Sequence, residues 1–320
     1  EAVRVSADGT VIRGNQSSAW RGSWISYDHV HTTVGFDKGA ELTWNPYYAH
    51  SITLSPRYAL SDEFFLSASW TLEQELTNSD WTTSQNELVW SDIALTAGWS
   101  GWAEPTTEVR VTPTLRVTLP VSEVSAAQTQ ILAISPSVRL SRNFSLLGGL
   151  YLAWSATWTQ RFHEETTARL DASGVVGCET DACADAERFA NTGVRNAWGD
   201  LSTGPSAVLT LQPGLRFNVD MRWTKAWLYD AADATVLVQG EEREVASSPA
   251  TRGFDGRYGT YFGIGLAYDL LDSLTLTGAV YTPSPQLDME GQRRSPFFNR
   301  FTRVGLSVGV DVDTFAQKYF

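Results

Sequence analysis

Apolar and polar side chains alternate along most of the chain with a period of two residues. In residues 109–119, the odd positions hold only Val, Pro and Leu, whereas the even positions hold only Thr and Arg. Residues 304–312 repeat this arrangement with Val and Leu on one parity. A period of two places the apolar residues on one face of a β-strand and the polar residues on the other. A helical period is nowhere sustained, so we expect an all-β protein.

The alternating segments and the turn residues between them define a series of antiparallel strands. These are predicted at about residues 24–36, 47–60, 63–75, 87–99, 106–119, 127–140, 143–159, 206–217, 219–229, 257–269, 273–283 and 299–312. The first strand alternates least clearly. It is included because a closed barrel with both termini on one side needs an even number of strands. About 12 strands result, which is within the range of single-chain barrels.

Short and long connections alternate along the chain. Tight hairpins are predicted at residues 60–62, 141–143, 218 and 270–272, and a slightly longer one at 100–105. Longer segments lie between them, at about 76–86, 120–127, 160–205, 230–256 and 284–298. Short turns at one end and long loops at the other are typical of membrane barrels, in which the turns are periplasmic and the loops extracellular.

Three features indicate that the apolar face points outward into lipid, although a soluble sandwich has the same alternation with that face inward. Aromatic residues gather near both ends of the predicted strands, as in the interfacial girdles of membrane barrels. The polar face is rich in Ser and Thr, whereas a solvated sheet surface would carry Lys and Glu. The strands also match the roughly 9–11 residues that cross a bilayer at a tilt. The aromatic residues are Phe64, Trp99, Trp102, Phe144, Phe217 and Tyr268 near the short turns, and Tyr48, Trp90, Trp154, Trp158 and Trp227 near the long loops.

The sequence resembles the outer-membrane β-barrel proteins of Gram-negative bacteria. The last strand of these proteins commonly ends in a C-terminal aromatic residue, and Phe320 matches this feature. Thr314, Ala316 and Lys318 depart from the alternation that should precede it, so the last strand is expected to end near Val312 and to leave a short tail. The resemblance implies an integral outer-membrane protein in contact with outer-membrane lipid and lipopolysaccharide. It identifies no particular family within this group.

Composition narrows the function classes and the domain organisation. The net charge is −12, with no basic excess along the chain, so a nucleic-acid-binding role has no electrostatic basis. No linker divides the 320 residues. We therefore expect one domain at 22–320, the transmembrane barrel, preceded at 1–21 by a tail or by a segment that folds into the lumen.

Arginines on the polar parity suggest charge inside the barrel. Arg57, Arg139 and Arg216 are each expected about three residues before a short turn, at a similar depth near the periplasmic end. One interpretation is a cationic belt that favours anionic or zwitterionic solutes. The other is an ion-pair lattice that props the barrel open. The candidate lumen-lining residues are Arg57, Arg110, Arg116, Arg139, Arg216, Glu108, Asp220, Asp269 and Asp311.

The cysteines, the histidines and a G-x-S-x-G match give little indication of a catalytic or metal site. Cys178 and Cys183 have four residues between them in the longest loop, where a disulfide is the natural expectation for an exported protein. The four histidines are too few and too scattered for a metal cluster, and we expect no metal and no cofactor. Residues 305–309 match the G-x-S-x-G motif, but Ser307 lies inside an alternating strand rather than at a strand-to-helix turn.

Three functions remain open, and the first is preferred. It is an outer-membrane channel, without enzymatic activity, for passive passage of small hydrophilic and in particular anionic solutes. The second is a non-conducting barrel that has a structural role or docks an envelope protein partner, which residues 160–205 are long enough to support. The third is a surface hydrolase using His50, which has lipid-face parity near the loop end; no partner serine can be named.

Overall fold

The structure is a computed structural model of the 320-residue chain. It describes residues 4–5, 11–12, 18–33, 47–77, 86–99, 102–170, 190–230, 234–238, 241–245, 256–285 and 292–319. The side chains of residues 4–5, 11–12, 169–170, 190–194, 234–238, 241–245 and 285 lie outside this description.

The described residues form one closed antiparallel barrel of 12 strands, so the predicted fold class and strand number are confirmed. Each strand pairs with the next along the barrel, and β21 pairs with β3 to close it, with Arg303 opposite Thr32 and Asp311 opposite Trp24. Closure leaves no sheet edge, so backbone groups are paired within the wall, as the hydrocarbon requires. The strands are β3 (Trp24–Thr32), β4 (Tyr48–Ser55), β6 (Phe64–Glu75), β8 (Ile93–Trp99), β10 (Arg110–Leu119), β11 (Gln130–Phe144), β12 (Leu150–His163), β15 (Ala197–Gln212), β16 (Leu215–Leu228), β19 (Gly256–Leu271), β20 (Leu274–Pro285) and β21 (Arg303–Asp311).

Shorter elements extend or accompany the wall. β5 (Arg57–Ala59) continues β4, while β7 (Leu88–Trp90) and β9 (Trp102–Ala103) continue β8 at its two ends. Three two-stranded ladders lie apart from the barrel sheet: β1 (Arg4–Val5) with β2 (Val11–Ile12), β13 (Thr167–Leu170) with β14 (Ala190–Arg195), and β17 (Ala234–Val238) with β18 (Glu241–Val245). The helices are α1 (Glu123–Ala127) and α3 (Val312–Tyr319). Over the described ranges, no helix has the length and apolar character needed to cross a membrane.

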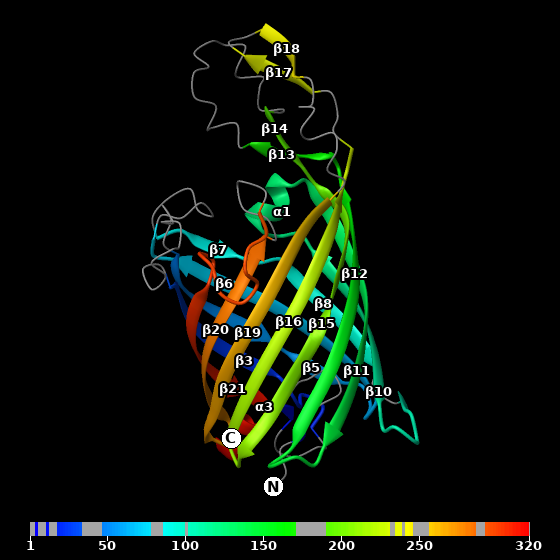
Figure 1. Cartoon of the computed structure of the whole chain (residues 1–320), viewed down its shortest axis with the longest axis vertical. Helices are drawn as coiled ribbons and strands as arrows, with labels where there is room; N and C mark the ends of the chain where they lie inside the picture. The colour runs from blue at the N-terminus through cyan, green and yellow to red at the C-terminus, as the bar shows by residue number, and fades with distance from the viewer. Residues whose placement is uncertain are drawn as a thin grey trace.

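The two ends of the barrel differ, as the sequence predicted. At one end the strands are joined by short turns, and α3 lies there too (Figure 1). The other end carries α1 and the β13–β14 and β17–β18 ladders (Figure 1). We call these the periplasmic and the extracellular end, following the rule for membrane barrels.

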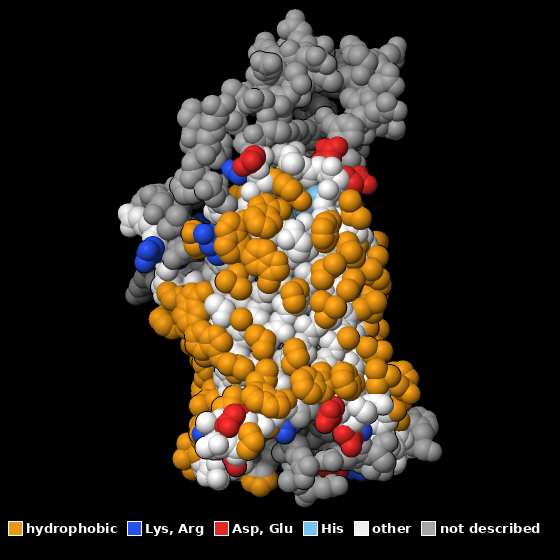
Figure 2. Space-filling view, turned by 90° about the vertical axis from the view of Figure 1, so that its right-hand side faces the viewer, with side chains coloured by type: hydrophobic (Ala, Val, Ile, Leu, Met, Phe, Trp, Pro, Cys, Tyr) orange, Lys and Arg blue, Asp and Glu red, His pale blue; other side chains and the backbone are white. Residues whose placement is uncertain are grey.

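The apolar parity faces outward. Leu306, Leu115 and Leu266 on the outer wall are 56%, 49% and 47% exposed, whereas Thr112 on the opposite parity of β10 is fully buried. Figure 2 shows orange hydrophobic side chains over the middle of one side of the barrel, with acidic and basic side chains towards its two ends. This is an apolar band between charged rims, so the prediction of an integral outer-membrane barrel is confirmed.

Two predicted hairpins were misplaced. The turn expected at 141–143 lies at 145–149, because β11 continues to Phe144. The turn expected at Asn218 lies at Pro213 and Gly214, where Gly214 adopts a φ of 80° that a residue without a Cβ tolerates best. Asn218 is instead an inward-facing residue of β16 that lines the lumen.

One further expectation about the chain was wrong. β12 continues to His163 and β15 begins at Ala197, so the connection between them is shorter than the predicted 160–205. The last strand ends at Asp311, close to the predicted Val312, and the short tail that follows it forms the helix α3. The Asp311 carboxylate accepts a hydrogen bond of 2.9 Å from the Thr314 N–H and so caps the first turn of this helix.

Candidate functional site: the barrel lumen

A cavity of 590 Å³ occupies the lumen towards the periplasmic end. Its lining comes from strands on opposite sides of the wall, including Ser26 on β3, Thr96 on β8, Asn218 on β16 and Thr275 on β20. Ser, Thr and Asn side chains line this space together with small apolar residues such as Ala94 and Ala267. Arg57, Arg116 and Arg216 also line it.

A second cavity of 410 Å³ lies next to the first and shares Ser67, Thr96 and Arg116 with it. Three arginines, Arg116, Arg139 and Arg222, line this cavity. Apart from Phe65, the remaining lining is Ser and Thr, and among the described lining residues none is Asp or Glu. We call this second space the central cavity. It is a small polar compartment with a concentration of positive charge.

Arg216 at the first cavity is fully paired. Its two terminal nitrogens donate to the two carboxylate oxygens of Asp269 at 2.9 and 2.8 Å. The Thr275 hydroxyl donates to the same carboxylate at 3.1 Å. The side chains of Arg216 and Asp269 are only 8% and 12% exposed. A bidentate ion pair of this kind is rigid, and the carboxylate neutralises most of the positive charge of the guanidinium. The role of Arg216 is therefore mainly structural.

Arg57 is held against an aromatic ring. Its guanidinium carbon lies 4.3 Å from the centre of the Phe65 ring, and Nη1 donates to the Arg21 carbonyl at 3.1 Å. Phe65 points inward because the neighbouring strand has Gly98 opposite it: a Cβ built on Gly98 would lie 2.2 Å from the Phe65 ring. Cation–π contact and burial therefore fix the position of Arg57.

The other predicted lumen residues lie at different depths. Arg110 stands at the periplasmic end of β10, on the parity of Thr112. Glu108 lies in the turn before β10, with a φ of 58°, and is exposed. Asp220 accepts from Nη2 of Arg222 at 3.3 Å, and both side chains are partly exposed. Asp311 is fully buried at the cap of α3.

The structure thus brings together only part of the predicted set. Arg57 and Arg216 share the first cavity and Arg139 lines the central one, with Arg116 between them. Arg216 follows its turn by two residues rather than preceding it by three, because the turn lies at Pro213 and Gly214. Its depth near the periplasmic end is the same in either case.

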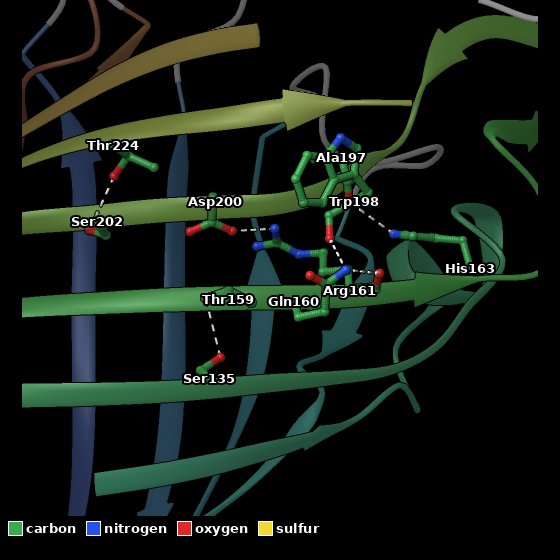
Figure 3. A network of polar contacts seen from close by, with 10 residues as sticks. All are labelled: Ser135, Thr159, Gln160, Arg161, His163, Ala197, Trp198, Asp200, Ser202 and Thr224. Carbon is green, nitrogen blue, oxygen red and sulfur yellow. Dashed lines mark hydrogen bonds and ion pairs between the residues drawn. The ribbon is translucent and has the colours of Figure 1, made fainter. Parts of the chain in front are cut away.

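A polar network joins neighbouring strands of the wall towards the extracellular end (Figure 3). Arg161 on β12 forms an ion pair with Asp200 on β15. Gln160 Nε2 donates to the Trp198 carbonyl at 2.9 Å, and His163 bridges the carbonyls of Gln128 and Ala197 at 2.8 and 3.2 Å. Hydroxyl pairs continue the network along the wall: Ser135 with Thr159, and Thr224 with Ser202, each at 3.2 Å.

Beside this network is a pocket of 280 Å³, which we call the outer vestibule. Arg161, Arg195 and Arg257 line it with Asp200, the one carboxylate among its described lining residues. Arg195 donates to the Tyr229 carbonyl and Arg257 Nη2 donates to the Arg195 carbonyl at 3.0 Å, so backbone groups hold both guanidinium groups in place. The described lining of the vestibule thus holds three cationic side chains and one carboxylate.

Sequence reasoning missed Arg222, Phe65 and the vestibule arginines. Arg222 has the same parity as Arg216 and Asp220, so counting along one uninterrupted strand would have found it. Arg161 and Arg195 were missed because they were assigned to a loop.

The cysteines and His50, singled out in the sequence, are not among the lumen residues that the structure describes. Cys178 and Cys183 lie outside the described residues. The described residues contain no group of three or more side chains suited to hold a metal ion. His50 stands opposite His29 on the outer wall; its Nε2 lies 2.9 Å from Oε1 of Gln74 and its Nδ1 3.5 Å from the Tyr27 hydroxyl. Within the described ranges, neither ring nitrogen has a serine partner.

Comparison with known proteins supports the fold. The chain is similar to an outer-membrane channel from Pseudomonas putida F1, with a TM-score of 0.54 and 11% sequence identity over 93% of this chain and 99% of that one. The chain has the fold of an outer-membrane β-barrel. Weaker likenesses are to the NanC porin (TM-score 0.46, 7% identity, covering 90% of this chain and 98% of that one) and to the KdgM porin in complex with disordered oligogalacturonate (0.43, 8%, 90% and 98%). A scan of family models and a search of curated proteins give no match.

This similarity confirms the resemblance to outer-membrane barrels that the sequence suggested. At this level of identity it concerns the fold alone. What passes through the lumen has to be argued from the residues that line it.

Proposed function

We propose that the protein is a passive outer-membrane channel for small hydrophilic solutes, with a preference for anionic ones. The central cavity carries this proposal: Arg116, Arg139 and Arg222 face a space otherwise lined by hydroxyl groups and Phe65. A solute that loses part of its hydration shell there can accept hydrogen bonds from guanidinium groups and from hydroxyl groups. Negative charge on the solute is favoured by Coulomb attraction.

The arginines do not contribute equally. Arg216 is neutralised by Asp269, and Asp220 offsets part of the charge of Arg222. The preference for anions therefore rests mainly on Arg116, which is exposed and lines both cavities. An anion about 4 Å from one guanidinium in water-like surroundings gains about 1 kcal/mol, about fivefold in local concentration.

The outer vestibule supports the same preference. Arg161, Arg195 and Arg257 place positive charge at the extracellular end of the lumen, where a solute would enter. A positive entrance raises the local concentration of anions, and the effect declines with ionic strength. Entrance and central cavity thus favour the same class of solute.

The proposal is tested by uptake into liposomes that contain the purified protein. The solutes should be matched in size: a neutral sugar, its carboxylate derivative and its amino derivative. We expect entry of all three above protein-free liposomes, with the carboxylate fastest and the cationic solute slowest. Liposomes that remain closed to all three would contradict a channel. Equal rates would leave a channel but refute the role of the arginines.

A further inference from the structure

A groove of 610 Å³ runs along the outer wall of the barrel, on the lipid-facing side of β11, β12, β15 and β16. Its lining is mostly apolar and includes Leu140, Leu152, Trp154, Pro205, Ala207 and Met221. The groove exists because β15 presents the small side chains of Pro205 and Ala207, whereas the strands beside it present larger ones. Ala207 lies directly between Leu152 and Val219 in the register.

Aromatic residues limit the groove towards the extracellular end. Trp154 stacks with Trp223, with ring centres 6.2 Å apart, and the Trp154 indole N–H donates to the Thr203 hydroxyl at 2.9 Å. Both indole rings are therefore held in place across β15. The groove is therefore a shallow apolar depression that ends at these rings.

The periplasmic end of the groove carries a cation. Arg142 lies on the outward parity of β11, opposite Leu152 of β12, and it lines the groove. Its guanidinium carbon lies 4.8 Å from the centre of the Phe144 ring. Its Nε is buried, and no group in the described part of the chain accepts a hydrogen bond from it. A charged side chain on the lipid face is unfavourable unless it meets a partner at the interface.

We propose that this groove binds one glycerophospholipid of the periplasmic leaflet, with an acyl chain along Leu140, Leu152 and Ala207 and the phosphate on Arg142. The apolar lining of the groove suits the acyl chain of such a lipid, and the Arg142 guanidinium suits its phosphate. Arg142 precedes the turn at 145–149 by only a few residues, which places it at the level of the headgroups. The outer leaflet holds lipopolysaccharide, so the depth of Arg142 selects phospholipid instead.

This site is independent of conduction through the lumen, since its residues face the opposite side of the wall. It would stand whether or not the barrel is a channel. The proposed lipid site gives a role to Arg142, which does not face the lumen.

Native mass spectrometry of the protein extracted in mild detergent tests the proposal. The two test variants are Arg142→Gln, which removes the charge, and Ala207→Phe, which fills the groove without adding charge. Lys225→Gln is the matched control for charge: its Nζ lies 4.9 Å from the Trp227 ring centre, near the extracellular end of β16. Gly278→Phe is the control for bulk, because a Cβ there meets nothing within 4 Å.

We expect one phospholipid to stay bound to the wild-type protein and to both controls. Titration with phosphatidylglycerol should show binding about tenfold weaker for Arg142→Gln, the loss of one charge-assisted hydrogen bond. Ala207→Phe should lose the lipid as well and keeps the test decisive if Arg142→Gln fails to fold. Equal lipid retention by the test variants and the controls would overturn the proposal. So would a wild-type protein without lipid, or one whose Arg142-dependent adduct is lipopolysaccharide.

Discussion

Arg216 and Asp269 form a bidentate ion pair across β16 and β19, at 2.8 and 2.9 Å, near the periplasmic end of the lumen. Sequence analysis left two roles open for the lumen arginines, a cationic belt and an ion-pair lattice. In the structure Arg216 belongs to an ion pair, as in the second of these roles. The charge available to solutes lies deeper, on Arg116.

Replacing Asp269 by Asn should destabilise the barrel. It leaves the Arg216 guanidinium buried without its counter-charge, and breaking a buried pair in this way costs about 3 kcal/mol. The double variant Arg216→Met with Asp269→Leu removes both charges and should recover most of the loss. The measurement is the temperature at which the barrel loses its folded migration in detergent gels. An Asp269→Asn variant as stable as the wild type would show that the ion pair does not stabilise the barrel.

Arg116→Gln should reduce anion selectivity more than Arg216→Gln. Arg116 is exposed to the lumen and lines both cavities, whereas Asp269 already neutralises Arg216. The check is the change in the anion-to-cation permeability ratio of each variant in planar bilayers. An equal or larger effect at Arg216 would contradict the ranking.

Asp200→Asn should strengthen the attraction of the outer vestibule for anions. The substitution removes the carboxylate that pairs with Arg161 and leaves three cations around the vestibule. We expect anion conductance to rise at low salt, with a smaller gain at high salt because of screening. Leu201→Val, an apolar change on the outer face of the same strand, is the control. A fall in anion conductance at low salt would refute this role of Asp200.

The turn between β9 and β10 should resist acid. A hydrogen bond with the Thr107 side chain is the largest cause that lowers the pKa of Glu104, and the N–H groups of Thr107 and Thr106, which donate to its carboxylate, add to it; together they lower the pKa to about 2. A lowered pKa stabilises the turn at pH values above the ordinary carboxyl range. That stability is lost as the pH falls through about 2. NMR titration of the Glu104 carboxyl should give this low value, and a midpoint near 4 would contradict the hydrogen bonding.

The barrel could be predicted because lipid outside and polar space inside impose a period of two on every crossing strand. Where a segment leaves the bilayer, that constraint ends. The ends of β12 and β15 around His163 and Ala197 were therefore assigned to a loop. The vestibule arginines went unrecognised with them.

Other misses have local causes. Asn218 is a common turn residue, yet here its side chain faces the lumen, so the composition of a turn misled the assignment. The helix α3 was read as a tail because Thr314 and Lys318 broke the strand pattern. The helical spacing of Val312, Phe315 and Tyr319 was a signal for it that went unused. The contact between Arg216 and Asp269 joins residues far apart in sequence, and no single-strand pattern contains it.

The reversal potential of the wild-type protein in a planar bilayer, under a gradient of potassium chloride, tests the central claim most directly. Chloride and potassium ions have similar mobility in water, so the sign of this potential reports the charge inside the lumen. The arginine-lined central cavity predicts discrete conductance steps with a reversal potential of the sign set by chloride. A potential of the sign set by potassium, or a membrane that stays electrically silent, would contradict the account.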